Sequence, residues 1–152
     1  MRGETNGTGV SLVEVYEVGG AGGSRLVNLA TRGNTGAGAN QLVAGLYVAG
    51  NAPKQLLIRG VGPGLAGFGV AGALANPQLQ VMQGATAVAA NDDWNNDAAV
   101  GAASTAVGAF ALAPASRDAA LLVTLNPGAY TVVVSGVGNT SGVALVEVYE
   151  VP

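Results

Sequence analysis

The chain of 152 residues contains no cysteine and no histidine. The absence of cysteine excludes disulfides, zinc–thiolate sites and thiol chemistry. Without either residue, a Ser-His-Asp or Cys-His nucleophilic centre cannot be assembled. We therefore expect a protein that is not an enzyme.

Charged and aromatic residues are also scarce, at 10% and 5% of the sequence. Soluble domains are typically about 25% charged, so a surface this poor in charge favours a protein that partners cover. Six Lys and Arg against nine Asp and Glu give a net charge of −3, which predicts no nucleic-acid partner. No apolar run reaches the roughly 18 residues of a membrane-spanning helix, so we expect no membrane insertion.

Glycine, by contrast, is abundant, and its 25 residues separate short apolar runs at turn-like intervals. This pattern predicts an all-β protein, a single β-sandwich of Greek-key or jelly-roll type with about seven to nine short strands and at most one short helix. The expected strands cover residues 25–31, 41–49, 55–61, 78–83, 85–90, 121–125, 130–134 and 143–151. Alternating side chains on both sides of the turn Asn126-Pro127-Gly128 predict a hairpin there.

The one expected helix covers residues 97–108, which are rich in alanine. Asp97 would be its N-cap, and Gly108 would end it.

The strongest pattern is a segment that occurs twice, 133 residues apart. Residues 6–18 read NGTGVSLVEVYEV, residues 139–151 read NTSGVALVEVYEV, and ten of the thirteen positions are identical. A sandwich has one place for a given strand. One copy is therefore a spare edge strand, which we expect to pair with a neighbouring molecule or repeat. The positions expected to carry this assembly are apolar or aromatic: Val10, Leu12, Val13, Val15, Tyr16, Val18, Val143, Leu145, Val146, Val148, Tyr149 and Val151.

The glycine-rich residues 19–23 predict a flexible connector after the spare strand at 10–18. We therefore expect two parts, with the spare strand and its connector in residues 1–23 and the sandwich domain in residues 24–152.

The densest polar cluster lies at residues 91–97. Asp93, Asn95 and Asp97 are spaced as in the first half of a calcium loop, although the glycine and the final glutamate of an EF-hand are absent. The residues predicted to bind Ca²⁺, the only cofactor considered, are Asp92, Asp93, Asn95 and Asp97. The alternative is an Asx-rich loop that caps the short helix. Trp94 could stack on a carbohydrate, or it could pack at the end of the sandwich.

Two further motifs have a structural interpretation. Gly62-Pro63-Gly64-Leu65-Ala66-Gly67 fits GxGxxG, but no helix and no well-placed acidic residue follow it, so we interpret it as a turn. The strand glutamates Glu14, Glu17, Glu147 and Glu150 are expected to face solvent or to pair with Arg25, Arg32, Arg59 or Arg117.

Several short sequence motifs together resemble those of a tandem repeat in large bacterial surface proteins from Verrucomicrobia-like lineages. They are SRLVNLATRG at 24–33, KQLLIRGVGP at 54–63, ANPQL at 75–79, NDDW at 91–94 and residues 143–149. The C-terminal half is also similar to pre-peptidase C-terminal domains, which are secreted jelly-roll-like sandwiches. The resemblance, which covers residues 24–151, implies secretion, modularity and no catalysis.

The sequence therefore predicts a structural module, extracellular or at the cell surface, that assembles with itself head to tail into filaments or arrays by donating a strand. In a long array, residues 10–18 would instead be the tail of the preceding repeat. The alternative function is a calcium- or carbohydrate-binding module of a secreted multidomain protein, acting through the 91–97 loop.

Overall fold

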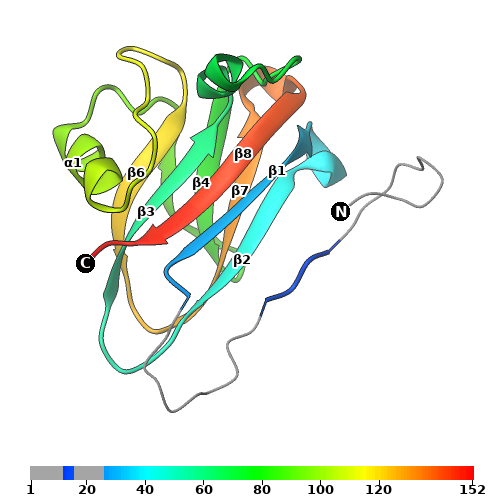
Figure 1. The fold of residues 1–152 in the computed structure, drawn as a ribbon. Helices are drawn as coiled ribbons and strands as arrows, with labels where there is room; N and C mark the ends of the chain where they lie inside the picture. The colour runs from blue at the N-terminus through cyan, green and yellow to red at the C-terminus, as the bar shows by residue number, and fades with distance from the viewer. Residues whose placement is uncertain (1–11, 16–25) are drawn as a thin grey trace.

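The computed structural model describes residues 12–15 and 26–152, which form a sandwich of two four-stranded antiparallel sheets (Figure 1). Sheet A has the strand order β1 (Asn28–Thr35), β8 (Gly142–Glu150), β3 (Lys54–Val61) and β6 (Ala119–Leu125). Sheet B has the order β2 (Leu42–Val48), β7 (Gly128–Gly136), β4 (Pro77–Gln83) and β5 (Thr86–Asn91). Short 3-10 turns at Gly38–Asn40, Pro63–Phe68 and Val137–Asn139 and one α-helix, α1 (Ala98–Ala106), complete the described elements.

The strands pair in a nested order. The first pairs with the last (β1–β8), the second with the seventh (β2–β7), the third with the sixth (β3–β6) and the fourth with the fifth (β4–β5). This is the pairing of a jelly roll. The predicted all-β sandwich is therefore confirmed, and each strand expected from residue 25 onward is present with its ends shifted by a few residues.

The hairpin predicted at Asn126-Pro127-Gly128 is wrong. The turn carries the chain from β6 in sheet A to β7 in sheet B, and these two strands do not pair. Alternation of side chains marks a strand but does not identify its partner, and here both strands supply one face to the core between the sheets. Among the described strands, the one hairpin of consecutive elements is β4–β5, which turns at Gly84 with φ +58°.

The core between the sheets is built of Val, Leu, Ile and Ala side chains, with Tyr130 as its aromatic member. Ile58, Leu79, Val132 and Val134 are completely buried in it. The packing is close, because a Cβ added to Gly60 would lie 3.2 Å from a methyl of Val134. A sequence with so few aromatic residues fills its core in this way.

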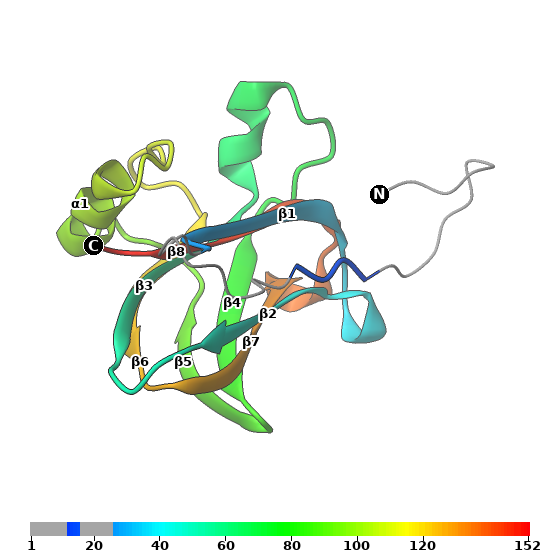
Figure 2. The same ribbon diagram turned by 60° about the horizontal axis from the view of Figure 1, so that its bottom comes forward.

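The outer face of sheet A is covered by a second core. Leu57 and Val61 of β3 pack there with Leu65, Val100 of α1 and Leu112. Figure 2 shows α1 outside sheet A, on the side away from sheet B. The helix itself was predicted correctly, because Asp97 caps its start and Gly108 follows its end with φ +72°. β3 and β8 are therefore buried on both faces.

The described part of the spare segment is not a strand. Leu12, Val13 and Val15 are exposed, with Leu12 at 74%. The rest of the expected strand at 10–18 and the connector at 19–23 lie outside the described residues. Within residues 12–15 and 26–152, no helix has the length and apolarity needed to cross a membrane.

Candidate functional site

The second copy of the duplicated segment forms β8, which lies inside sheet A. It pairs with β1 on one side and with β3 on the other, so that Val148 is opposite both Leu29 and Ile58. The interpretation of this copy as an edge strand is therefore wrong, since the edge strands of sheet A are β1 and β6. The reason is the order of the jelly roll, which inserts the last strand between the first and the third.

Side chains alternate along β8 between the two cores. Ala144, Val146 and Val148 are buried between the sheets. Leu145 and Tyr149 contact the second core on the outer face. Because both faces are used, almost every position of β8 has a specific neighbour.

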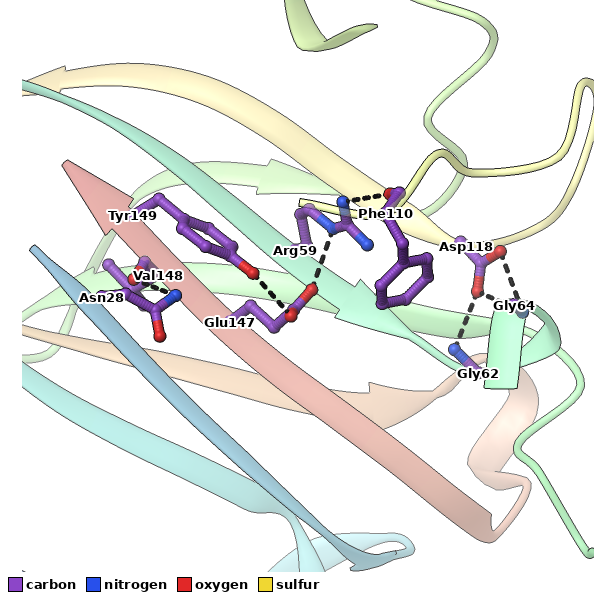
Figure 3. A network of polar contacts seen from close by, with 9 residues as sticks. All are labelled: Asn28, Arg59, Gly62, Gly64, Phe110, Asp118, Glu147, Val148 and Tyr149. Carbon is purple, nitrogen blue, oxygen red and sulfur yellow. Dashed lines mark hydrogen bonds and ion pairs between the residues drawn. The ribbon is translucent and has the colours of Figure 1, made fainter. Parts of the chain in front are cut away.

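The outer face of β8 also carries a buried ion pair (Figure 3). Arg59 Nε of β3 lies 3.0 Å from Glu147 Oε2, and the two side chains are 0% and 7% exposed. The guanidinium also donates from Nη1 to the carbonyl of Phe110 at 2.7 Å and lies 4.3 Å from the centre of the Phe110 ring. Arg59 Nη2 is buried without a hydrogen bond, and the Nε contact is not aligned as one, so Glu147 is the charge that compensates Arg59.

The sequence placed Arg59 among four candidate partners of the strand glutamates, and the structure confirms this pairing. The expectation that these glutamates face solvent is wrong for Glu147. Burial lowers the pKa of Arg59, and the charge of Glu147 opposes this effect. A lone arginine inside the apolar run 56–61 was the sequence signal for a buried pair.

Tyr149 extends this network. Its hydroxyl donates to Glu147 Oε1 at 2.8 Å. Burial, followed by the hydrogen bond to Glu147 and the charge of that carboxylate, raises the pKa of Tyr149 from 10.0 to about 12. The phenol is therefore held neutral by burial, together with the carboxylate that compensates the charge of Arg59.

We predict that Tyr149 makes the fold sensitive to alkaline pH. Its pKa is raised in the folded chain, so its contribution to stability is complete below pH 10 and is lost as the pH rises to about 12. The free energy of unfolding should fall more steeply across this window in the wild type than in Tyr149→Phe. Urea unfolding at a series of pH values measures the slope, and equal slopes would contradict the prediction.

At the start of β8, the backbone lies in close contact with the backbone of residues 72–74. Leu74 N donates to Val143 O, and Val143 N donates to Gly72 O, both at 2.8 Å. A Cβ added to Gly142 would lie 2.7 Å from Leu74 Cα, so only glycine fits at this position. At the other end, Lys54 Nζ lies 2.8 Å from Glu150 Oε1 in a more exposed ion pair.

The GxGxxG loop is the structural turn that the sequence predicted. Asp118, which is completely buried, accepts from Gly62 N at 2.8 Å and from Gly64 N at 3.1 Å, and Ser116 Oγ donates to its other oxygen at 2.8 Å. The backbone N–H groups that hold a phosphate in a nucleotide-binding loop are here occupied by the chain's own carboxylate. Sequence reasoning missed Asp118, because it lies 54 residues from Gly64.

Several polar side chains of the 91–97 loop form hydrogen bonds within the loop or to the start of α1. Asp97 Oδ1 accepts from Ala99 N and Val100 N at 2.8 and 3.0 Å, as the capping interpretation predicted. The amides of Asn91 and Asn95 both donate to the carbonyl of Asp93 at 2.9 Å. Within the part of the chain that the structure describes, no three acidic side chains gather as a metal site would require. Calcium binding through Asp92, Asp93, Asn95 and Asp97 stays a prediction.

Trp94 is half-buried against the second core rather than at the end of the sandwich. Its indole N–H reaches the carbonyl of Ala113 at 3.2 Å and the hydroxyl of Ser116 at 3.1 Å. These contacts give Trp94 a packing role and tie the 91–97 loop to the segment that carries Asp118.

The strands of sheet B are uncharged, and several of their apolar side chains are exposed. None of its four strands, all of which the structure describes, contains a charged residue. Val43 and Tyr47 of β2 and Val88 of β5 are 52%, 72% and 43% exposed. Sheets commonly use charged residues to prevent association, and this sheet lacks them.

No protein-family model and no curated protein sequence matches the chain. Its fold is similar to that of the pre-peptidase C-terminal domain of collagenase from Bacillus anthracis, with a TM-score of 0.48 and 14% sequence identity. The match covers 80% of this chain and 89% of that domain. Membership of a tandem repeat stays a prediction.

Proposed function

We propose that the chain is a non-catalytic structural module that works outside the cell and joins head to tail with further copies of itself. One observation carries the proposal. The sandwich already contains β8 as an integrated inner strand, while residues 10–18 repeat the sequence of that strand. The chain therefore holds one strand of this kind more than its own sheets use.

The surface of the sandwich supports association. The uncharged strands of sheet B and the exposed Val43 and Tyr47 favour contact with another protein surface over solvation. A head-to-tail contact does not use the same patch on both partners, so it grows filaments unless its rotation closes a ring. The same contact between successive domains of one long chain would give an array.

A structural role also agrees with the chemistry of the polar groups. Arg59, Glu147 and Asp118 are the most buried charged side chains among the described residues, and each is held by neighbours within the fold. With no histidine and no cysteine, the sequence offers no Ser-His-Asp or Cys-His centre for acyl transfer.

Deletion of residues 1–20 tests the proposal. We expect the purified full chain to form filaments or oligomers, seen by electron microscopy and light scattering, and the deletion variant to be monomeric. Deletion of residues 1–5, which leaves the duplicated segment intact, is the matched control and should assemble like the full chain. Assembly of the variant without residues 1–20, or a monomeric full chain at high concentration, would refute the proposal.

A further inference from the structure

We infer that the N-terminal segment of one copy displaces β8 of another and takes its position between β1 and β3, in the register that β8 itself uses. The inference rests on the proposed self-association and names its acceptor site. The offset of 133 residues aligns each position of β8 with one position of residues 9–17.

The first requirement of the β8 position is a glycine at its start. Gly142 is the position where a Cβ would lie 2.7 Å from the backbone of Leu74. The equivalent residue of the N-terminal segment is Gly9, and Val10 follows it as Val143 follows Gly142. The segment can therefore make the same close contact with residues 72–74.

The second requirement is a carboxylate for Arg59. A strand without it would leave a completely buried guanidinium without its compensating charge. Glu14 is the equivalent of Glu147, and Tyr16 is the equivalent of Tyr149, whose hydroxyl donates to that carboxylate. The N-terminal segment thus carries both members that β8 contributes to the buried network.

Further positions of the N-terminal segment also match their equivalents in β8. Val13 and Val15 match Val146 and Val148, which pack in the core between the sheets. Glu17 matches Glu150, the partner of Lys54.

A strand that was added at an open edge of the sandwich would not need these identical residues. An edge contact uses main-chain hydrogen bonds and one alternating face, and it has no use for a carboxylate matched to Arg59 or a glycine matched to Leu74. The glycine, glutamate and tyrosine that the two segments share therefore favour the inner β8 position over the edges of the two sheets.

One difference makes the chain's own strand the better occupant. Ala144 is completely buried, and its equivalent is Ser11, whose hydroxyl would enter the same apolar core. A buried hydroxyl without a partner is unfavourable, so Ser11→Ala should raise the equilibrium constant for assembly about tenfold. Conversely, Gly9→Ala should lower assembly, because its Cβ would meet the backbone of Leu74.

Disulfide trapping tests the acceptor site directly, because the full chain has no cysteine of its own. Val148 is opposite Ile58 of the inner strand β3, so the inference places Val15 of one copy opposite Ile58 of another. We expect oxidised Val15→Cys/Ile58→Cys to give a ladder of linked chains on a non-reducing gel. The control, Val15→Cys/Val43→Cys, reports addition at the β2 edge and should give no ladder.

The outcomes separate the inference from the function on which it rests. Assembly without a ladder at Ile58, or with a ladder only at Val43, overturns the acceptor site and leaves self-association standing. Assembly that Ser11→Ala does not raise and Gly9→Ala does not lower also overturns it. A full chain that stays monomeric in every variant overturns both.

Discussion

Replacing Glu147 by alanine is expected to destabilise the sandwich by about 3–5 kcal/mol, the usual effect of breaking a buried ion pair by removing one partner. Arg59 is completely buried, and its Nη2 already has no hydrogen bond. Without Glu147, the guanidinium would keep the Phe110 carbonyl and ring as neighbours but would lose its compensating charge. Urea unfolding, followed by the fluorescence of Trp94, gives the change in unfolding free energy.

Two further variants assign the effect to the buried charge. Glu150→Ala breaks an ion pair whose lysine is 37% exposed, so it should change stability by at most about 1 kcal/mol. The double variant Arg59→Met/Glu147→Leu removes both charges and should recover most of the stability that Glu147→Ala loses. A loss below about 1 kcal/mol in Glu147→Ala, or no recovery in the double variant, would contradict this account of the pair.

The strands and the helix could be predicted from the sequence because their signals are local. Glycines bound the apolar runs, and Asp97 and Gly108 bound α1. The pairing of the strands could not be predicted in the same way. β8 joins β1 across more than 100 residues, and the turn after β6 looks the same locally whether it forms a hairpin or crosses between sheets.

The candidate site could be predicted only in part, because local patterns do not show which strands pair. The duplication identified β8 as the important strand, and Arg59 was named among the partners of its glutamates. The position of β8 inside sheet A follows from the order of the strands, and the burial of Glu147 depends on the second core, to which α1 and residues 109–112 contribute. No local pattern reveals either. This burial turns a repeated strand pattern into a specific set of residues that a replacement strand must match.

Replacing Asp118 by alanine is the second change expected to have a large effect, about 3–5 kcal/mol. The carboxylate satisfies Gly62 N and Gly64 N, and a hydrogen bond to a charged group contributes about 1.5–3 kcal/mol. The loop lies close against the backbone of Leu74, since a Cβ at Gly62 would overlap the Leu74 carbonyl oxygen. Loss of the acceptor should therefore loosen residues 62–64 and the contact of Leu74 with β8. Hydrogen exchange of these backbone amides, together with urea unfolding, measures both effects.

Two controls define what Asp118 contributes. Asp118→Asn keeps one oxygen for Gly62 N, so it should retain part of the stability that Asp118→Ala loses. Asp97→Ala removes an exposed carboxylate that caps α1, and it should lose only about 1 kcal/mol. Because Leu74 also holds Val143 at the start of β8, the loosened loop should make β8 easier to displace. Equal stability of Asp118→Ala and Asp97→Ala, with unchanged exchange at Gly62 and Gly64, would show that the carboxylate does not hold this loop.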